Sequence, residues 1–363
     1  MSSPLPAPPG RHSLRLAEHT TLGLGGPAKS LVRVSEQAEL VEAVRAADRA
    51  AEPLLLLGGG SNLVVSDAGF PGTVVQVDVR GVSVRTDPMD PDRRYVRVGA
   101  GENWTRFVEW SVGEGLSGVE CLAGVPGNVG ATPIQNVGAY GQEVSQTITE
   151  VVVYDRHEDR MRTLGNADCA FGYRTSALKG TDRYVVCAVV FALHRSPHSQ
   201  PIAYRELARH LGVDQGDTVE LRSAHDAVVD LRRGKGMVLD PEDPDSRSAG
   251  SFFTNPILAP NEHTELRKRV YERFGPDIVP PEFPTPDGRT KTSAAWLIDR
   301  SGFERGYTRG PVRISTKHTL ALTNPGAGTA ADLLALAREI RAGVADTFGV
   351  TLVNEPVLVG VEL

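Results

Sequence analysis

The sequence has 363 residues and a formal charge of −6. Its 38 glycines and 25 prolines together make up about 17% of the chain, whereas average usage is about 12%. This length suggests two or three domains with ample core, and a hydrophobic content of 40% excludes a disordered chain. The mildly acidic balance argues against a nucleic-acid-binding protein, which would carry a basic face. The glycine and proline excess must therefore lie in particular loops of a folded protein.

The sequence lacks the signals of a membrane or secreted protein. The longest nearly unbroken apolar stretch, residues 184–193, is too short to span a bilayer. Residues 1–13 lack the basic start and apolar core of a signal peptide, so we expect a short disordered leader there. The cysteines are odd in number and lack metal-ligand spacing, which predicts a reduced, cytoplasmic protein without a metal site; they are Cys121, Cys169 and Cys187.

Residues 14–80 are predicted to form a small βαββ unit. A strand at 31–34 precedes Ser35, which we expect to cap a helix because residues 39–47 have helical spacing. The buried strand LLLL (54–57) runs directly into GGGSNLVVSD, and 73–79 is again a strand.

Residues 81–196 are predicted to form a mainly β unit with few helices. The apolar and alternating runs that indicate its strands are 82–86, 95–101, 148–155, 161–165 and 184–193. The polar stretch 195–201 contains two prolines and is predicted to link this unit to a third one, residues 197–363.

The third unit is predicted to contain three helices and a closing strand. Ser223 would cap a helix over 223–236, with Arg232 and Arg233 at its C-terminal end, and an acidic loop follows. A short helix is predicted over 293–302. The last helix begins after Thr329, with Asp332 completing a capping box, and ends at Gly349, after which residues 350–363 are predicted to form a strand.

Three glycine-rich segments could hold a ligand. GLGGPA (23–28) fits a dinucleotide fingerprint, but no apolar strand precedes it and Pro27 interrupts the turn. GGGSNLVV (58–65) directly follows a strand, and its glycines would let backbone N–H groups approach a pyrophosphate, with Ser61 and Asn62 as further donors. A glycine-rich hairpin turn is an equally open interpretation of that segment.

The richest segment is LAGVPGNVGATPIQNVGAYG (122–141), which has five glycines and two prolines but no helical or strand period. It also contains apolar residues that a polar linker would lack, and prolines that a core strand could not hold. We expect an ordered loop wrapped around a flat or extended ligand, with Gln135 and Asn136 offering amide edges. An Ω-loop without a ligand is the alternative.

These segments, in this order, resemble the UDP-N-acetylenolpyruvoylglucosamine reductase family. The matching pieces run from about residue 19 to 356 and are HTTLGLGGPA, LLGGGSNL, LAGVPGNVGATPIQNVGAYG, FGYRTS, RRGKG, AGSFFTNP, AAWLID and NEP. AGSFFTNP and the long glycine and proline segment are highly specific, whereas GGGSNL alone would indicate only the wider flavin-binding fold.

The resemblance implies an α+β chain: a two-subdomain FAD-binding unit of the vanillyl-alcohol-oxidase-like type, followed by an α/β substrate-binding domain. FAD would be bound non-covalently and reduced by NADPH. The reduced flavin would then reduce the enolpyruvyl ether of a UDP-sugar to UDP-N-acetylmuramate for peptidoglycan synthesis. The partner implied is this small molecule, with no nucleic acid or membrane, and a monomer is favoured.

The resemblance also implies the residues that hold the cofactor, all of them in the second and third glycine-rich segments. They are Gly58, Gly59, Gly60, Ser61, Asn62, Gly124, Pro126, Gly127, Gly130, Ala131, Gln135, Asn136 and Gly138.

Three residues match the family's catalytic positions. Arg174 in FGYRTS would stabilise the enolate, since a guanidinium offers a planar fork to a carboxylate. Ser251 in AGSFFTNP corresponds to the proton donor. Glu355 in NEP, expected inside an apolar strand, would be protonated through burial and donate a hydrogen bond to developing negative charge. Without the resemblance, a surface salt bridge, a turn serine and a solvent-facing glutamate would be the simpler interpretations.

Five residues match substrate-binding positions: Tyr140, Tyr173, Tyr204, Lys235 and Asn255. Lys235 is implied to contact the diphosphate, although a cation at a helix C-terminus also stabilises the helix dipole. Tyr204 resembles the tyrosine that covers the UDP in the longer form of the family.

Two other functions stay open on the sequence. A sugar or alcohol oxidase of the same fold with covalent flavin would need a histidine or cysteine in the cofactor loops; residues 122–141 contain neither, and Cys121 lies just outside. A catalytically silent flavin or UDP-sugar binding protein would be expected to lack at least one of Arg174, Ser251 and Glu355.

Overall fold

The computed structural model describes residues 14–363, so the predicted leader lies outside the described residues. The first unit is built on a parallel sheet in the order β1-β4-β2, with bounds Ala28–Val34, Phe70–Val77 and Leu54–Leu57. Helix α1 (Gln37–Arg49) connects β1 to β2, which confirms the expected strand–helix–strand order. Ser35 is not the cap, because the helix starts two residues later, where Glu39 accepts hydrogen bonds from the N–H groups of Ser35 and Glu36.

The second unit is an antiparallel sheet in the order β11-β10-β12-β6-β5, with β7 also paired to β12. The strands are β5 (Val82–Thr86), β6 (Arg93–Gly99), β7 (Leu116–Ser117), β10 (Ile148–Asp155), β11 (Arg160–Gly165) and β12 (Tyr184–Arg195). Each predicted strand is present. The central strand β12 is almost wholly buried, which explains its unbroken apolar run.

Helix α2 (Trp104–Gly113) is a helix that the strand-rich pattern of this unit did not predict. Asn103 caps it by accepting a hydrogen bond from the Arg106 N–H at 3.0 Å. Its buried face includes Trp104 and Phe107, whose rings pack against Phe191 of β12 at centroid distances of 5.8 and 5.1 Å. Aromatic residues favour strands in isolation, and here tertiary packing decides the helix.

Helices α3 (Arg205–Leu211) and α4 (Leu221–Gly234) pack with the second unit. Their apolar residues Leu207, Ala224 and Val228 join one buried core with residues of α1, α2 and β12. The predicted boundary between residues 196 and 197 falls inside this core, and the division into domains stays a prediction. Ser223 lies within α4 and not at its start, because the helix begins after Glu220.

The remaining chain forms a second large core. Its antiparallel sheet has the order β13-β19-β18-β17, and a smaller sheet has the order β14-β16-β15. The strands are β13 (Ser248–Ser251), β14 (Ile257–Leu258), β15 (Glu282–Pro284), β16 (Thr290–Thr292), β17 (Thr308–Arg309), β18 (Val312–Ile314) and β19 (Ala321–Thr323). The helices are α5 (Pro260–Phe274), which the sequence did not predict, α6 (Ala294–Arg300) and α7 (Ala330–Phe348). The capping box at Thr329 and the stop at Gly349 are confirmed.

The predicted closing strand over 350–363 is wrong in extent. Only β20 (Val357–Val359) is a strand, and it pairs in parallel with β3 (Leu63–Val65) of the first unit. Glu355 therefore lies just before a strand and not inside one. Pro356 explains the late start, since it has no N–H for a ladder and restricts the backbone before it.

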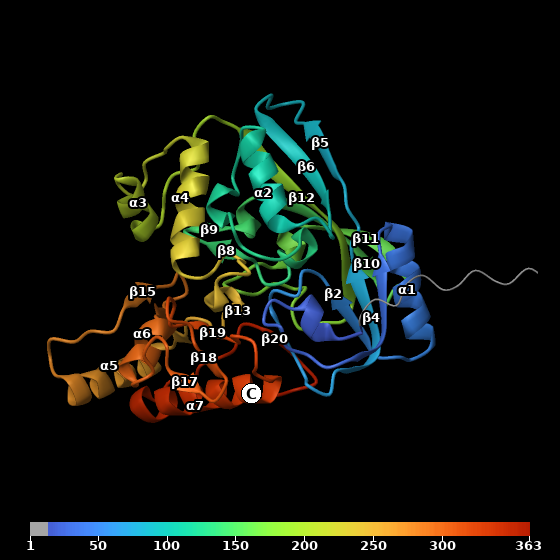
Figure 1. Cartoon of the computed structure of the whole chain (residues 1–363). Coiled ribbons are helices and arrows are strands. Elements are labelled where there is room, and N and C mark those ends of the chain that lie inside the picture. Colours follow the sequence, from blue (N-terminus) through green and yellow to red (C-terminus); the bar gives the residue numbers. More distant parts are fainter. Residues whose placement is uncertain (1–13) are drawn as a thin grey trace, which may run out of the picture.

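Short elements complete the chain: the two-stranded β8 (Gly138–Ala139) and β9 (Gln142–Glu143), and the 3₁₀ turns Leu16–His19, Glu120–Leu122, Val129–Ala131, Val144–Gln146, Ala167–Cys169 and Pro244–Ser246. Figure 1 shows α5, α6 and α7 on one side of the molecule, β5, β6 and β12 on the other, and β8, β9, β13 and β20 between them. No helix among residues 14–363 is both long and apolar enough to cross a bilayer.

Candidate active site

The two glycine-rich loops touch each other backbone to backbone. A Cβ added to Gly59 would lie 2.8 Å from the Cα of Gly127, so neither loop has room for a side chain there. The Ser61 hydroxyl donates to the carbonyl of Pro126 at 3.0 Å, and the Asn62 amide donates to Oε1 of Gln135 at 3.0 Å. The loop after β2 and the segment 122–141 therefore form one structure.

The loop after β2 fits an anionic pyrophosphate. Within residues 14–363, no acceptor is hydrogen-bonded to the backbone N–H of Gly58, Gly59 or Gly60. Successive unpaired N–H groups at the end of a strand form a concavity that attracts anions. This backbone geometry supports a phosphate-binding role for the loop.

Several predicted cofactor residues have evident packing roles. A Cβ on Gly60 would lie 1.8 Å from the carbonyl oxygen of His19, and one on Gly130 would lie 2.5 Å from the Cβ of Ala100. The Ala131 N–H bonds to Asn128 within a turn. Asn136 is 1% exposed, and its amide donates to Glu143 and Gly172, so that side chain holds loops together instead of facing a ligand.

Gln135, Arg174 and Glu355 come together at the end of the glycine-rich segments. Oε1 of Glu355 lies 3.2 Å from Nε of Arg174 and accepts a hydrogen bond from the Gln135 amide at 3.4 Å. The Asn62 amide also reaches the Glu355 backbone carbonyl, at 3.4 Å. Segments far apart in the sequence thus place a carboxyl, a guanidinium and an amide at one point.

Arg174 is held in a backbone conformation that is unusual for a residue with a side chain. Its φ is 53°, in the left-handed region. Nη2 donates to the carbonyl of Gly138 at 2.6 Å, and Nζ of Lys179 donates to the Arg174 carbonyl at 2.8 Å. These contacts fix the guanidinium, and left-handed residues of this kind are concentrated at functional sites.

Glu355 is largely withdrawn from water, with a side chain 15% exposed. Burial raises the pKa of its carboxyl, and the neighbouring charges of Arg174 and Lys179 oppose this without cancelling it. A carboxyl with a raised pKa keeps its proton at a higher pH and can donate a hydrogen bond.

Ser251 is brought to this cluster through the backbone. It ends β13, and Gly250 before it has a φ of 74°. The next residue, Phe252, is buried, and its carbonyl accepts a hydrogen bond from the Glu355 N–H at 2.8 Å. The segments that carry Ser251 and Glu355 are therefore paired through their backbones.

Tyr173, beside Arg174, lies close to residues of the second core. Burial raises the pKa of the Tyr173 phenol, and the nearby Arg174 and Asn255 partly oppose this. Oδ1 of Asn255 accepts from the Ala294 N–H at the start of α6, at 3.0 Å. Lys291 of β16 lies over the Tyr173 ring at 4.7 Å. No sequence pattern pointed to Lys291, because its place depends on the hairpin that carries it.

Tyr140, Tyr204 and Lys235 form a second cluster. The rings of Tyr140 and Tyr204 meet edge to face at a centroid distance of 5.4 Å, and Nζ of Lys235 lies 5.5 Å from the Tyr140 ring. Burial raises the pKa of Tyr140 to about 12. Tyr204 is 45% exposed and lies at the start of α3. Three predicted substrate residues from separate segments are thus side by side.

The two arginines that end α4 have different environments. Arg233 is exposed and pairs with Asp230, which agrees with a role at the helix end. Arg232 is 8% exposed, donates from Nη2 to the Met237 carbonyl at 2.9 Å, and has no partner for Nε in the described part of the chain. Burial lowers its pKa to about 10. Arg232 lies in the last turn of α4, as predicted, but its side chain is buried.

The cysteines are unsuited to hold a covalent flavin. All three thiols are free and buried, and burial raises the pKa of Cys121 above its usual range and that of Cys169 and Cys187 to about 11. A buried thiol with a raised pKa is a poor nucleophile.

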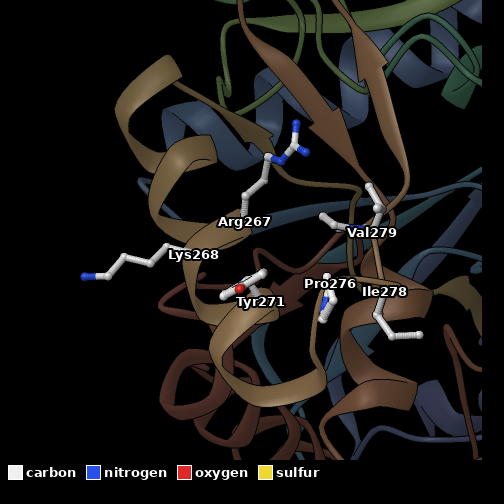
Figure 2. Close-up of a pocket in the computed structure, with 7 residues that line it drawn as sticks. Arg267, Lys268, Tyr271, Pro276, Ile278 and Val279 are labelled. Atoms are coloured by element: carbon white, nitrogen blue, oxygen red, sulfur yellow. The ribbon is translucent and has the colours of Figure 1, made fainter.

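A pocket of about 270 Å³ lies away from these clusters, between α5 and the segment before β15. Figure 2 shows Tyr271, Val279 and Pro276 around it, while Lys268 extends away from the other side chains. None of the predicted site residues lines it.

Two family models match parts of the chain. Residues 28–159 match the family model "FAD binding domain", and residues 241–359 match "UDP-N-acetylenolpyruvoylglucosamine reductase, C-terminal domain". A UDP-N-acetylenolpyruvoylglucosamine reductase of Thermobifida fusca is 64% identical over 96% of this chain and 97% of its own length. One from Streptomyces avermitilis is 58% identical over 97% and 95%.

A solved structure agrees with these relatives. The UDP-N-acetylenolpyruvylglucosamine reductase of Thermus caldophilus superposes with a TM-score of 0.64 at 26% identity, covering 96% of this chain and 98% of that one. The fold and the glycine-loop geometry define an α+β flavoprotein with an FAD-binding domain, as the sequence predicted. The chain belongs to the UDP-N-acetylenolpyruvoylglucosamine reductase family.

Proposed function

We propose that the protein uses NADPH to reduce the enolpyruvyl ether of UDP-N-acetylglucosamine to UDP-N-acetylmuramate, with FAD bound non-covalently. The observation that carries the proposal is the cluster of Arg174, Gln135 and Glu355 beside the glycine loops. The segment of Ser251 reaches this cluster because the carbonyl of the next residue, Phe252, accepts a hydrogen bond from the Glu355 N–H. The names of the close relatives support the same substrate and reaction.

In this proposal the glycine loops hold the FAD, with the N–H groups of Gly58, Gly59 and Gly60 facing its pyrophosphate. When bound and reduced by NADPH, the flavin would supply the hydride that adds to the terminal alkene carbon of the substrate. The same site receives NADPH first and the UDP-sugar afterwards.

The side chains then stabilise the negative charge that hydride addition creates, and one of them supplies a proton. Arg174 binds the substrate carboxylate and stabilises the enolate, because its guanidinium stays charged and donates to the Gly138 carbonyl, while Lys179 holds its backbone carbonyl. Glu355, protonated through its raised pKa, donates a hydrogen bond to the same negative charge. Ser251 gives its proton to the carbon next to the carboxylate, which completes the reduction.

Tyr140, Tyr204 and Lys235 would bind the UDP part, with Lys235 on the diphosphate and the tyrosines covering it. Tyr173 and Asn255 would orient the sugar side of the site. In this scheme the units 14–80 and 81–196 bind FAD and residues from 197 onward complete the substrate site.

The test is a pair of half-reactions measured by stopped flow. Purified protein should be yellow, and denaturation should release FAD. Ser251→Ala should leave flavin reduction by NADPH nearly intact and slow the oxidation of reduced flavin by the UDP-sugar by about 10² or more, as expected when one transition-state contact is lost.

Ser83→Ala is the matched control, because Ser83 is exposed on strand β5 away from the clusters. It should change neither half-reaction. Colourless protein without FAD affinity would refute the proposal, and equal slowing of both half-reactions in Ser251→Ala would refute the proton-donor role.

A further inference from the structure

Lys235, the proposed diphosphate ligand, already has a carboxylate partner in the fold. Nζ of Lys235 lies 2.5 Å from Oε2 of Glu206. Glu206 is in the first turn of α3, two residues after Tyr204, whose ring meets Tyr140. The acid and the tyrosine thus reach the substrate cluster from the same short segment.

Glu206 is surrounded by positive and polar groups. Its negative charge acts on Tyr140, Tyr204 and His318 and raises the pKa of each. His318 is a neighbour of Lys235 and Arg232; burial, followed by these two charges, lowers its pKa to about 4. Arg232 contributes a buried guanidinium whose Nε has no partner in the described chain.

This cluster holds more positive than negative charge. Arg232, Lys235 and Glu206 all act on His318, and Glu206 pairs with Lys235, whereas the diphosphate of a UDP-sugar carries about two negative charges. Two anions bound to the same Lys235 ammonium repel each other at this distance, so the Glu206 carboxylate weakens the binding of a diphosphate to Lys235. The Lys235 and Glu206 side chains are 31% and 39% exposed, so separating them costs little.

We propose that Glu206 is an internal competitor of the substrate's diphosphate: its carboxylate occupies Lys235 and must give way when the UDP-sugar binds. Glu206 thereby sets the affinity of the site for UDP compounds and couples the release of Lys235 to the segment that carries Tyr204. This inference rests on the proposed function, since it takes the UDP-sugar as the ligand.

The test measures the binding of UDP to the FAD-loaded protein by isothermal titration calorimetry. Glu206→Gln removes the competing charge and keeps the shape of the side chain, so the dissociation constant for UDP should fall about three- to tenfold. The affinity for uridine, which has no phosphate, should not change. FAD content and thermal melting check that the variant is folded.

Asp230→Asn is the matched control, because Asp230 is an exposed carboxylate on α4 that pairs with Arg233. It removes the same charge and should leave UDP affinity unchanged. In a Lys235→Met background, Glu206→Gln should no longer tighten binding, since the group for which the two anions compete is gone.

The outcomes separate the inference from the proposed function. The inference is supported if Glu206→Gln binds UDP more tightly than the wild type, Asp230→Asn does not, and Glu206→Gln has no such effect in the Lys235→Met background. Unchanged or weaker binding in Glu206→Gln, or equal tightening in Asp230→Asn, overturns the inference while leaving the proposed reaction intact. A wild-type protein that binds FAD but not UDP contradicts the proposed function, and the inference falls with it.

Discussion

Arg174 and Glu355 illustrate how single residues depend on their surroundings in this site. An arginine between strands usually forms a surface salt bridge, but this one has a left-handed backbone, a bond to Gly138 and a carboxyl partner that is largely buried. Glu355 is subject to two opposing effects: burial, which favours its neutral form, and Arg174, which favours its charged form. Burial is the stronger of the two, so the pKa of Glu355 lies above its ordinary value, in the direction that the proposed hydrogen-bond donor needs.

The raised pKa of Glu355 gives a pH prediction for the substrate half-reaction. A carboxyl with a raised pKa is protonated below that pKa and loses its proton as the pH rises through it, so the wild-type rate should fall by about tenfold per pH unit above it. Glu355→Gln has an amide that donates at every pH. The substrate half-reaction of this variant should be roughly 10- to 100-fold slower than that of the wild type at low pH, and its rate should not fall as the pH rises.

Stopped-flow oxidation of reduced flavin by the UDP-sugar, followed from pH 5 to 10, measures the effect. Glu265→Gln on the exposed face of α5 is the control and should keep the wild-type profile. The same falling limb in Glu355→Gln would show that another group titrates.

At the scale of the elements, the glycine loops are rigid because they pack against each other. Gly59 lies against Gly127, and Ser61 and Asn62 bond across to Pro126 and Gln135. The cofactor loops therefore share one geometry, and a side chain added to either one changes both.

Gly59→Ala should weaken FAD binding, because the new Cβ would lie 2.8 Å from the Gly127 Cα and force the loops apart. We expect at least a tenfold rise in the dissociation constant of FAD, measured by titrating apoprotein and following flavin fluorescence. Gly113→Ala in α2 is the control, since nothing lies within 4 Å of its Cβ; it should be neutral or slightly stabilising. Equal FAD affinity in wild type and Gly59→Ala would contradict the packing argument.

The sequence predicted correctly those helix ends and strands that depend on residues close together in the chain. The capping box at Thr329, the stop at Gly349 and the apolar run of β12 were evident in the sequence and are present. Helix α2 was missed because its aromatic residues favour strands until they pack on Phe191, and α5 because few of its residues are buried. The strand expected around Glu355 was wrong because Pro356 delays β20.

The site was predictable where the motifs are specific and not where it depends on long-range contacts. The resemblance led to Arg174, Ser251 and Glu355, but it did not indicate that Glu206 pairs with Lys235 or that Arg232 is buried. Those facts depend on how α3 and α4 pack, which no spacing in the sequence encodes.

At the scale of the whole molecule, the two large cores are joined by polar contacts from the first unit. The Asp67 carboxylate accepts hydrogen bonds from the N–H groups of Ala330 and Ala331 at 2.8 and 3.0 Å, so a residue after β3 caps helix α7. The Asn324 amide donates to the Leu22 carbonyl at 3.0 Å, and Leu22 itself belongs to the second core.

Asp67→Ala should destabilise the protein by about 1 kcal/mol, because α7 would lose an acceptor and a negative charge at its N-terminus. Urea unfolding followed by circular dichroism measures the loss. Asp67→Asn keeps an acceptor oxygen and should retain much of the stability. An unchanged midpoint in Asp67→Ala would show that water replaces the cap without cost.

The pairing of β20 with β3 constrains when the protein can become active during its synthesis. The Asn62 amide bonds to the Glu355 carbonyl across 293 residues of chain, a contact of very high sequence separation. At about 5–20 residues per second, a ribosome needs roughly 15 to 60 s to make the intervening chain. Until then β3 has an unpaired edge, which is prone to wrong pairing. A nascent chain can thus fold its first sheet early, but it cannot place the carboxyl of Glu355 beside the glycine-rich loops until β20 emerges.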